Sequence, residues 1–403
     1  MIDSKQKLAT LKRKKRPKLK YPEKFQAFLL LIVFVLLILF FNISGIITQD
    51  VEFSKEENRS LAQKPSLSVS DLLDGSYSKN LDSYFSDQFY LRNSWIRLKV
   101  NLDLLLGKQE SNGVYIGKDN YLMEIPVTPD SEWLNKNLKA IDDFAKRHQD
   151  KRVVMSVIPN SAYILSEKAP LNANVRNQAQ DEKMIADHLK HNLAFIEVSE
   201  VLKQHSDENI FYKTDHHWTS LGAKYVFEVL ANSLGIDNPI TDYKIFTVSD
   251  SFSGSMASKS GYLKSVDEIQ IMIPKTSNYS EIDLDTFVVK FPENRETCSL
   301  YSSEALKAKD QYTVFLGGNY SRVDIQTLND NGHVLLLIKD SYANCFVQFL
   351  TPYYEKIIMI DPRYYYDEIE QAISKEQITD ILFLYNMNTF LEDRSLADVL
   401  TVD

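Results

Sequence analysis

The sequence predicts an α/β fold, a parallel sheet flanked by helices, which follows one membrane-spanning helix near the amino terminus. Short, strongly apolar segments at residues 152–159, 334–338, 356–360 and 381–385 are typical of buried strands. Helical stretches separate these segments, an order that favours parallel strands with helices on both faces of the sheet. The chain of 403 residues leaves ample length for one large domain after the membrane segment.

The amino terminus carries a basic segment and then an apolar one. Residues 1–24 hold ten Lys or Arg and two acidic residues, a local charge of +8. Residues 27–47 form an almost unbroken apolar run, roughly 30 Å long as a helix and so long enough to span a bilayer. The basic flank predicts a cytoplasmic tail (1–24), an uncleaved single-pass signal anchor in the cell membrane (25–47) and an extracytoplasmic main domain. The alternative is a cleaved signal peptide, but the run is long for one and no small-x-small site follows before Gln49.

Charge limits the possible partners of the main domain. The formal charge of the whole chain is −9, so without the +8 of the tail residues 25–403 carry −17. An acidic exterior domain is a poor nucleic-acid binder. The two cysteines make no disulfide framework. Spacing does not decide whether Cys298 and Cys345 pair, and Cys345 is expected to be a small buried apolar residue.

Residues 48–110 are predicted to form a polar stalk and a helical segment that is broken near Gly75. The main domain, residues 111–403, begins with the runs GVYIG and NYLME, which predict a short hairpin around residues 118–120. Amphipathic spacing then predicts a helix over residues 133–147.

Further along, residues 181–192 are predicted to form a helix and residues 194–198 a strand. Residues 219–234 predict another helix, capped by Thr219 or Ser220 and followed by Gly235. Its expected apolar face consists of Leu221, Tyr225, Val229 and Leu230. Short alternating runs and turns at about residues 240–330 predict a β-rich insertion.

The strongest chemical signal is the tetrapeptide Asp215-His216-His217-Trp218 in KTDHHWTSLGA. In an extended segment the side chains of Asp215 and His217 point to the same side, so Asp215 is expected to orient His217 while His216 faces away. A histidine that is oriented by a carboxylate acts as the general base in a Ser-His-Asp triad. The motif lacks a nucleophile of its own, so a triad would need a serine from elsewhere in the chain.

Ser341 is the candidate nucleophile, because it follows the apolar strand at 334–338 and precedes a predicted helix. Open parallel sheets build their sites at the carboxyl ends of strands, and a strand-to-helix turn presents backbone N–H groups to an oxyanion. The alternative is that Ser341 or Asp340 merely caps the helix.

The motif and several other segments resemble the DHHW family of bacterial envelope proteins, which is similar to the SGNH-like alginate O-acetyltransferases. The other segments are, in chain order, ENRSLAQKP, YFSDQFYLRNSW, GVYIGKDNYL, FSGSMASKSG, LGGNY and LLLIKDSYAN. The resemblance implies an SGNH-hydrolase-like sheet and a catalytic triad of Ser341, His217 and Asp215. It also favours the nucleophile over the capping role for Ser341.

Four further residues have candidate roles in binding substrate or an oxyanion. Gly318 and Asn319 can donate a backbone amide and a side-chain amide to an oxyanion, although two glycines before an asparagine also describe an ordinary turn. The site role of Asn319 is implied by the resemblance alone. Trp218 can pack at the start of a helix or stack on a sugar ring. His216 can bond a backbone carbonyl and hold the loop.

A metal site is the alternative interpretation of the Asp-His-His cluster, with His188, His191 or His205 completing the ligand shell. Adjacent histidines in an extended segment diverge, and no Cys or HExxH pattern supports zinc. Neither a metal nor another cofactor is therefore expected.

Two classes of function follow. In the first, the resemblance implies a membrane-anchored O-acyl (acetyl) transferase or esterase that acts on a cell-envelope polysaccharide, with a multi-spanning membrane-bound O-acyltransferase as acyl supplier. Transferase and esterase share one acyl-enzyme, so the sequence does not separate them. In the second, the chain is a non-catalytic glycan-binding or scaffold protein of an envelope complex. Reaction of Ser341 with a serine-directed probe distinguishes the two classes.

Overall fold

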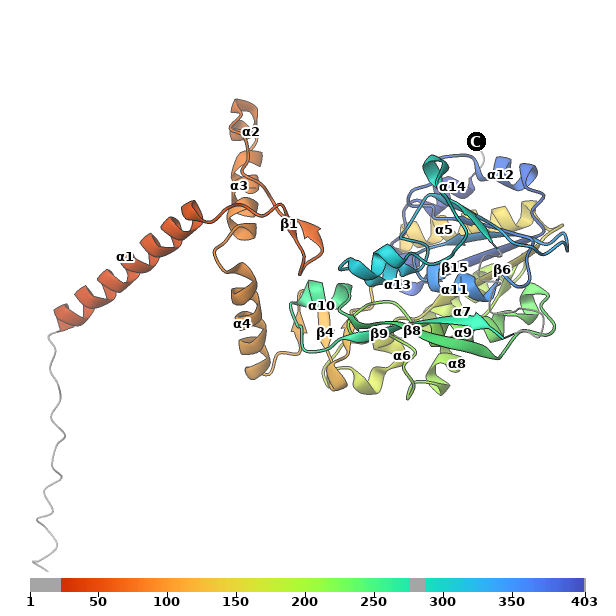
Figure 1. Ribbon diagram of the computed structural model, residues 1–403, viewed down its shortest axis with the longest axis horizontal. Helices are drawn as coiled ribbons and strands as arrows, with labels where there is room; N and C mark the ends of the chain where they lie inside the picture. Colours follow the sequence, from red (N-terminus) through yellow and green to blue (C-terminus); the bar gives the residue numbers. More distant parts are fainter. Residues whose placement is uncertain (1–22, 276–286, 402–403) are drawn as a thin grey trace, which may run out of the picture. The chain divides into compact units, whose positions relative to one another are not determined.

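The computed structural model describes residues 23–275 and 287–401 of the chain (Figure 1). By its internal contacts the chain divides into two compact units. The smaller unit comprises Met1–Phe53 and Ser60–Arg92, and the larger unit comprises Ser54–Arg59 and Asn93–Asp403. The larger unit thus starts before residue 111, where the sequence predicts the main domain to begin.

Helix α4 explains this earlier start. It spans Arg92–Leu105, and its Val100 is buried in an apolar cluster with a hairpin and with helix α10 (Ser255–Ser260). The hairpin consists of β4 (Val114–Ile116) and β5 (Leu122–Glu124), joined through residues 118–120, and its prediction is confirmed. The short strand β3 (Glu110–Ser111) pairs with β4.

The smaller unit contains the one helix, among the described residues, that is long and apolar enough to cross a membrane. This helix, α1 (Glu23–Ile47), has a candidate span at Phe25–Gly45 with a mean hydropathy of 3.0. It is the helix that the apolar run predicts. Nearly all of the predicted basic tail lies outside the described residues, and the orientation stays a prediction.

Two short helices follow in the smaller unit, α2 (Val69–Leu73) and α3 (Ser76–Asp87). Gly75 lies between them with a φ of +80°, a conformation that glycine adopts easily, so the predicted break is confirmed. The short strands β1 (Phe53–Ser54) and β2 (Arg59–Ser60) lie in the stretch predicted as a stalk.

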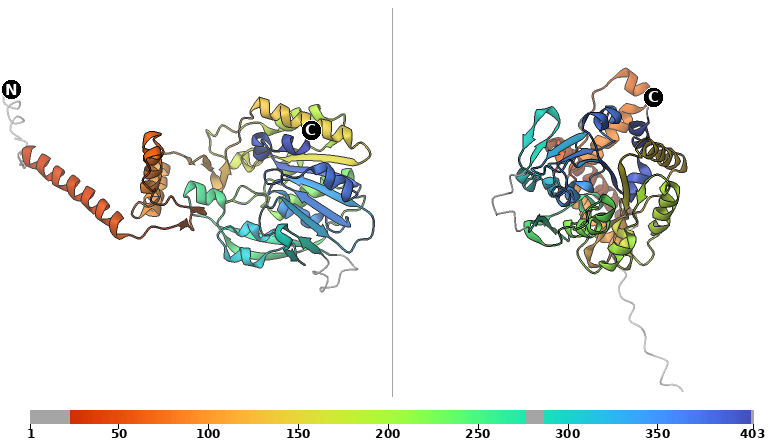
Figure 2. Two further views of the ribbon diagram at one scale, coloured as in Figure 1. Left: turned by 90° about the horizontal axis from the view of Figure 1, so that it is seen from above. Right: turned by 90° about the vertical axis from the view of Figure 1, so that its right-hand side faces the viewer.

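An eight-stranded sheet forms the centre of the larger unit (Figure 2). In spatial order its strands are β11 (Glu296–Thr297), β10 (Val288–Lys290), β12 (Arg322–Gln326), β14 (Lys356–Ile360), β13 (Val334–Lys339), β15 (Asp380–Asn386), β6 (Arg152–Ile158) and β7 (Ala194–Phe195). Strands β6, β13, β14 and β15 are the four buried strands that the apolar segments predict, and they pair in parallel.

The sheet is mixed, so the prediction of a parallel sheet is wrong at one edge. Strand β12 pairs antiparallel with β14, and β10 and β11 continue antiparallel beyond it. The physical reason is the short connection between β12 and β13. Parallel strands need a crossover of about a dozen residues or more, which residues 327–333 do not provide.

Successive residues of the central strands point to opposite faces, so the sheet has an apolar core on each side. One core contains α5 (Ser131–Arg147), α7 (Gln178–Leu189), α12 (Ile369–Lys375), α13 (Met387–Glu392) and α14 (Leu396–Leu400). The other contains α6 (Ser161–Ile164), α8 (Ser199–Gln204), α9 (Ser220–Leu230) and α11 (Ala343–Phe346). The predicted placement of helices on both faces is confirmed (Figure 2).

Helix α9 has the predicted cap but a different buried face. The Thr219 hydroxyl accepts a hydrogen bond from the Gly222 backbone N–H at 3.3 Å, whereas the predicted face residue Val229 is 39% exposed. The residues that α9 buries are Ser220, Gly222, Ala223, Val226, Phe227 and Leu230. This side packs closely because Gly222 has no side chain: a Cβ there would lie 2.4 Å from the Ile210 carbonyl oxygen.

Residues 240–330 divide into two parts. Strands β8 (Tyr243–Phe252) and β9 (Asp267–Pro274) form a ribbon of their own, with α10 between them. Strands β10 to β12 instead extend the large sheet. Only the first part is a separate β ribbon, and it contributes to the site described next.

Candidate active site

The DHHW segment is a tight loop between two paired stretches of chain. Phe211 and Trp218 face each other in an antiparallel bridge. Within the loop Asp215 Oδ1 accepts a hydrogen bond from the His217 backbone N–H at 3.0 Å and lies 2.5 Å from His217 Nδ1. The Asp215 carboxylate therefore both closes the turn and orients the imidazole ring.

The β8–β9 ribbon holds Asp215 from the other side. The Ser255 backbone N–H donates to Asp215 Oδ2 at 2.7 Å. A Cβ on Gly254 would lie 2.4 Å from Asp215 Cβ, so the absence of a side chain at Gly254 permits this close approach. Asp267 accepts three hydrogen bonds from the loop, two from backbone N–H groups and one from the Thr214 hydroxyl. The sequence indicates no site role for these residues, although Gly254 and Ser255 lie in FSGSMASKSG.

Ser341 lies two residues after the carboxyl end of β13, and its Oγ is 2.7 Å from His217 Nε2. A carboxylate only accepts, so Nδ1 of His217 carries the proton toward Asp215 and Nε2 is left to accept the Ser341 hydroxyl proton. Asp340 anchors the turn, because its carboxylate accepts from the backbone N–H groups of Tyr342 and Asn386 at 2.9 and 2.8 Å. The structure thus brings Asp215, His217 and Ser341 into one hydrogen-bonded line.

The helix after Ser341 is shorter than the sequence predicts. Helix α11 has four residues and continues as a 3₁₀ turn, Val347–Phe349. The Trp218 indole donates to the Tyr342 carbonyl at 2.9 Å and stacks on Phe346. Trp218 has no exposed surface, so of the two roles that the sequence leaves open for it, these contacts favour packing over stacking on a sugar ring.

His216 does not face away, which corrects the prediction for this side chain. Its Nδ1 lies 2.8 Å from Ser255 Oγ, and its ring centroid lies 3.8 Å from that of His217. The turn closed by Asp215 curls the chain, so the alternation of an extended segment does not apply here. The partner of the ring is a hydroxyl rather than the expected carbonyl.

Tyr312 is a site residue that the sequence does not reveal. It lies on a 3₁₀ turn, Gln311–Val314, and its ring stacks on that of His217 at a centroid distance of 3.7 Å and an angle of 9°. Its hydroxyl donates to the Ser341 carbonyl at 3.0 Å. Burial raises the pKa of the Tyr312 phenol well above its usual value, so the group remains a neutral donor.

Gly318 and Asn319 lie on a loop that is tied to the start of α11. The Asn344 side-chain amide donates to Asn319 Oδ1 at 2.9 Å and to the Gly318 carbonyl at 3.4 Å. Asn344 in turn accepts from the buried ammonium of Lys339 at 2.8 Å. Within the described ranges, neither the Gly318 backbone N–H nor Asn319 Nδ2 has a hydrogen-bond acceptor. Both groups are therefore available as donors, on a loop bonded to Asn344, which comes three residues after Ser341.

Electrostatics set the protonation of the Asp-His pair. Burial on its own raises the pKa of Asp215, but the neighbouring imidazoles and the hydrogen bonds from His217 and Ser255 outweigh burial and hold this pKa well below its usual range. Burial, together with the adjacent His216, lowers the pKa of His217 to about 4. His217 is therefore a neutral base at neutral pH, beside an ionised carboxylate.

The metal alternative does not fit these contacts. Ligand atoms of Asp215, His216 and His217 lie within 4.8 Å of one another, and this group includes none of His188, His191 and His205, all of which the structure describes. Asp215 and His217 bond each other at 2.5 Å, which leaves no space for an ion between their facing atoms, and the other nitrogen of His217 faces Ser341. An ion shared by these residues would have to break that line.

Comparisons with known proteins give one family match and several distant relatives. The family model described as "DHHW protein" matches residues 131–360, more than half of the chain. The probable alginate O-acetylase AlgJ of Pseudomonas putida is 23% identical over 180 residues, which cover 40% of this chain and 44% of the relative. AlgJ of Pseudomonas aeruginosa is 26% identical over 176 residues, or 41% and 43% of the two chains. The matched region thus spans less than half the length of these curated relatives.

Solved structures share the fold. A DHHW family protein from Eubacterium siraeum has a TM-score of 0.61 at 23% identity, covering 72% of this chain and 95% of its own. Bacillus cereus PatB1, in a structure with a sulfonyl adduct, has a TM-score of 0.56 at 21% identity, covering 70% and 95%. With the family model matched over more than half of the chain, including the DHHW loop and Ser341, this chain belongs to the DHHW family.

Proposed function

We propose that this chain is a membrane-anchored O-acyltransferase, or the closely related esterase, that modifies a cell-envelope polysaccharide outside the cytoplasm. The observation that carries the proposal is the hydrogen-bonded line from Asp215 through His217 to Ser341, with contacts of 2.5 and 2.7 Å. This is the arrangement by which a base activates a serine hydroxyl. The names of the AlgJ relatives support the acyl-transfer chemistry and the polysaccharide.

In the first half of the reaction, Ser341 Oγ attacks the carbonyl carbon of an acyl ester or thioester donor while His217 Nε2 takes the hydroxyl proton. The bond from the acyl carbon to the donor's leaving oxygen or sulfur then breaks, and His217 gives the proton to that atom. In the second half, an acceptor hydroxyl gives its proton to His217 and bonds to the acyl carbon. The bond to Ser341 Oγ breaks, and the proton returns to Ser341. With water as acceptor the same steps make an esterase.

The negative charge that forms on the carbonyl oxygen needs hydrogen-bond donors. We assign this role to the Gly318 backbone N–H and to the Asn319 side-chain amide, because both lack an acceptor among the described residues and their loop is tied to α11 through Asn344. Tyr312 holds the serine turn by its bond to the Ser341 carbonyl.

Acyl donors such as acetyl thioesters are made in the cytoplasm, so a transferase outside the membrane needs an acyl group delivered across it. We propose that a multi-spanning membrane-bound O-acyltransferase supplies this group. The apolar helix α1 would keep the catalytic unit at the membrane where the acyl group emerges. The fold is proposed to be SGNH-like, in keeping with the shared folds of the E. siraeum protein and PatB1.

A sulfonyl fluoride probe and a small acetyl ester test this function directly. Wild-type protein is expected to form a sulfonyl adduct on Ser341 and to release p-nitrophenol from p-nitrophenyl acetate, measured by mass spectrometry and absorbance. A neutral imidazole is needed for both reactions, so His217→Ala should block both. Protein that is neither labelled nor active with any acetyl ester contradicts the enzyme and favours the non-catalytic scaffold.

The pH dependence of ester hydrolysis is expected to follow the lowered pKa of His217. The free imidazole is the reactive form, so kcat/KM should stay level down to acidic pH and fall as the pH drops through about 4, instead of through the ordinary value of ~6.5. An inflection near the ordinary histidine pKa would contradict the lowered value. Since His216 contributes to the shift, His216→Asn should move the inflection upward.

The stability of the fold is also expected to depend on pH over the same acidic range. The unfolded chain binds a proton at the His217 position below ~6.5, whereas the folded protein does so only near 4, so this group's contribution to the free energy of unfolding decreases as the pH falls between these values. Circular dichroism at each pH separates loss of fold from loss of the reactive base.

The orientation of the chain in the membrane is open to a protease experiment. The basic flank of α1 predicts that protease added to intact spheroplasts removes the larger unit and leaves the amino-terminal tail protected. Antibody tags at both ends report each outcome, and an intact cytoplasmic enzyme is the control. A protected carboxyl-terminal tag would contradict the extracytoplasmic assignment.

A further inference from the structure

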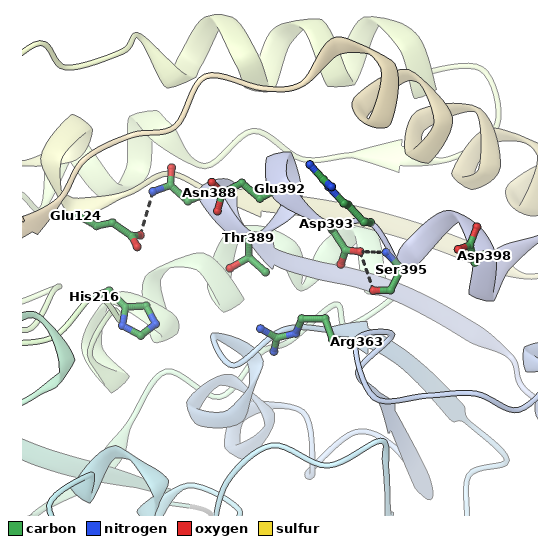
Figure 3. A pocket seen from close by; sticks show the side chains of 10 residues that line it. Glu124, His216, Arg363, Asn388, Thr389, Glu392, Asp393, Ser395 and Asp398 are labelled. Carbon is green, nitrogen blue, oxygen red and sulfur yellow. Dashed lines mark hydrogen bonds between the residues drawn. The ribbon is translucent and has the colours of Figure 1, made fainter. Parts of the chain in front are cut away.

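A cleft of about 550 Å³ is lined in part by His216 of the DHHW loop (Figure 3). Its lining includes Glu124 and His216 on one side, Arg363 and Asp393 on another, and Asn388 and Thr389 between them. The His216 ring, which forms part of its wall, is 3.8 Å from the ring of His217. Arg363 follows the carboxyl end of β14, and Asn388 follows that of β15. The cleft therefore opens at the sheet edge that carries Ser341.

Glu124 is held so that one carboxylate oxygen remains open. Its Oε2 accepts hydrogen bonds from the side-chain amides of Asn160 and Asn388 at 3.2 and 3.0 Å. Asn160 is itself fixed by two bonds with the buried Gln178. No described residue bonds Glu124 Oε1. Figure 3 shows the carboxylate with its bond to Asn388 at the edge of the cleft that also carries His216.

One of the two arginines that line the cleft is neutralised by a carboxylate outside it. Arg363 makes two bonds to the buried carboxylate of Asp361, at 2.8 and 2.7 Å. Among the acidic residues, Asp398 is paired with Lys136 at 2.7 Å. Of the remaining charged side chains that line the cleft, three are acidic and one is basic: Glu124, Glu392, Asp393 and Arg394. The cleft therefore carries an excess of negative charge.

We infer that this cleft binds the acceptor glycan and selects sugars that lack a carboxylate or phosphate group. The inference rests on the proposed function and adds the substrate class to it. Glu124 Oε1 accepts a hydrogen bond from a hydroxyl or ammonium group of the sugar, and the excess of carboxylates repels uronic acids and phosphorylated glycans. The polar lining and the volume suit one or two sugar units, since ligand pockets measure about 300–1,000 Å³.

Binding of short oligosaccharides to the full chain in detergent tests the inference without any chemistry at Ser341. Isothermal titration calorimetry is expected to show that the wild-type protein binds a partly deacetylated chitotetraose and binds a tetrauronate at least tenfold more weakly. The Glu124→Gln variant should bind the chitotetraose about tenfold more weakly than the wild-type protein does. Glu200→Gln, on the exposed surface of α8, is the matched control and should bind as wild type does.

The exposed residue Glu392 provides a second variant with little risk to the fold. Glu392→Lys reduces the excess negative charge, so the preference for chitotetraose over tetrauronate should decrease. Equal or tighter binding of the tetrauronate by wild-type protein overturns the inference, as does wild-type affinity in a folded Glu124→Gln. If the protein binds sugars in this charge-dependent way but the sulfonyl probe does not label it, the result supports glycan binding in the cleft and contradicts the proposed function. If the probe labels the protein but this binding is absent, the result supports the proposed function and contradicts glycan binding in the cleft.

Discussion

Ser341→Ala, His217→Ala and Asp215→Asn are each expected to reduce acetyl-ester hydrolysis and acyl transfer by up to ~10⁴-fold while leaving the fold intact. Ser341 is a weak nucleophile unless His217 takes its proton, and the two atoms lie 2.7 Å apart. In Asp215→Asn the partner of Nδ1 changes, so the imidazole loses the tautomer that leaves Nε2 free. The measurement is kcat/KM for p-nitrophenyl acetate, with the unfolding midpoint of each variant.

Combined substitutions should cost little more than single ones, because the three residues act as one unit. Matched controls lie outside the site: Asp187→Asn and His188→Ala on helix α7, and Ser303→Ala on an exposed turn. These variants should keep wild-type rates. Activity that survives Ser341→Ala would remove Ser341 as the nucleophile, and additive losses in the double variants would mean that the residues act independently.

Gly254→Ala is expected to reduce the same activity by about a hundredfold, because a displacement of about 1 Å at a catalytic group has an effect of this size. The backbone of Gly254, at φ −81° and ψ −166°, is open to alanine, so conformational strain is not the cause. The cause is steric, since the new Cβ would lie 2.4 Å from Asp215 Cβ and 2.5 Å from Oδ2. Asp215 must move, and the imidazole that it orients moves with it.

A double-mutant cycle tests this cause. Gly254→Ala should lower the unfolding midpoint in the wild-type background but have little effect in Asp215→Gly, where the clashing side chain is absent. Equal decreases in both backgrounds would show that Gly254 acts through something other than Asp215. Wild-type activity in Gly254→Ala would contradict the tight approach itself.

Local patterns in the sequence determined a large part of this fold. The apolar segments that became β6, β13, β14 and β15 are visible in sequence because burial on both faces requires an unbroken apolar run. Helix α1 is visible for a similar reason, since a helix that is able to span lipid needs a long apolar stretch. The Thr219 cap acts within three residues of itself. Asp215, His216 and His217 are recognisable as candidate site residues in the sequence because they are contiguous.

The tertiary structure alone decided which distant segments meet. His217 and Ser341 are 124 residues apart. Gly254 and Ser255 reach the loop from the start of α10, and Tyr312 reaches it from a 3₁₀ turn. Antiparallel pairing of β12 with β14 leaves no signature in an apolar pattern, and neither does the stacking of Tyr312 on His217. His216 faces the site because the loop curls around Asp215. Periodicity reports which face of an element is buried, whereas pairing between segments depends on shape and on polar groups that complement each other only after folding.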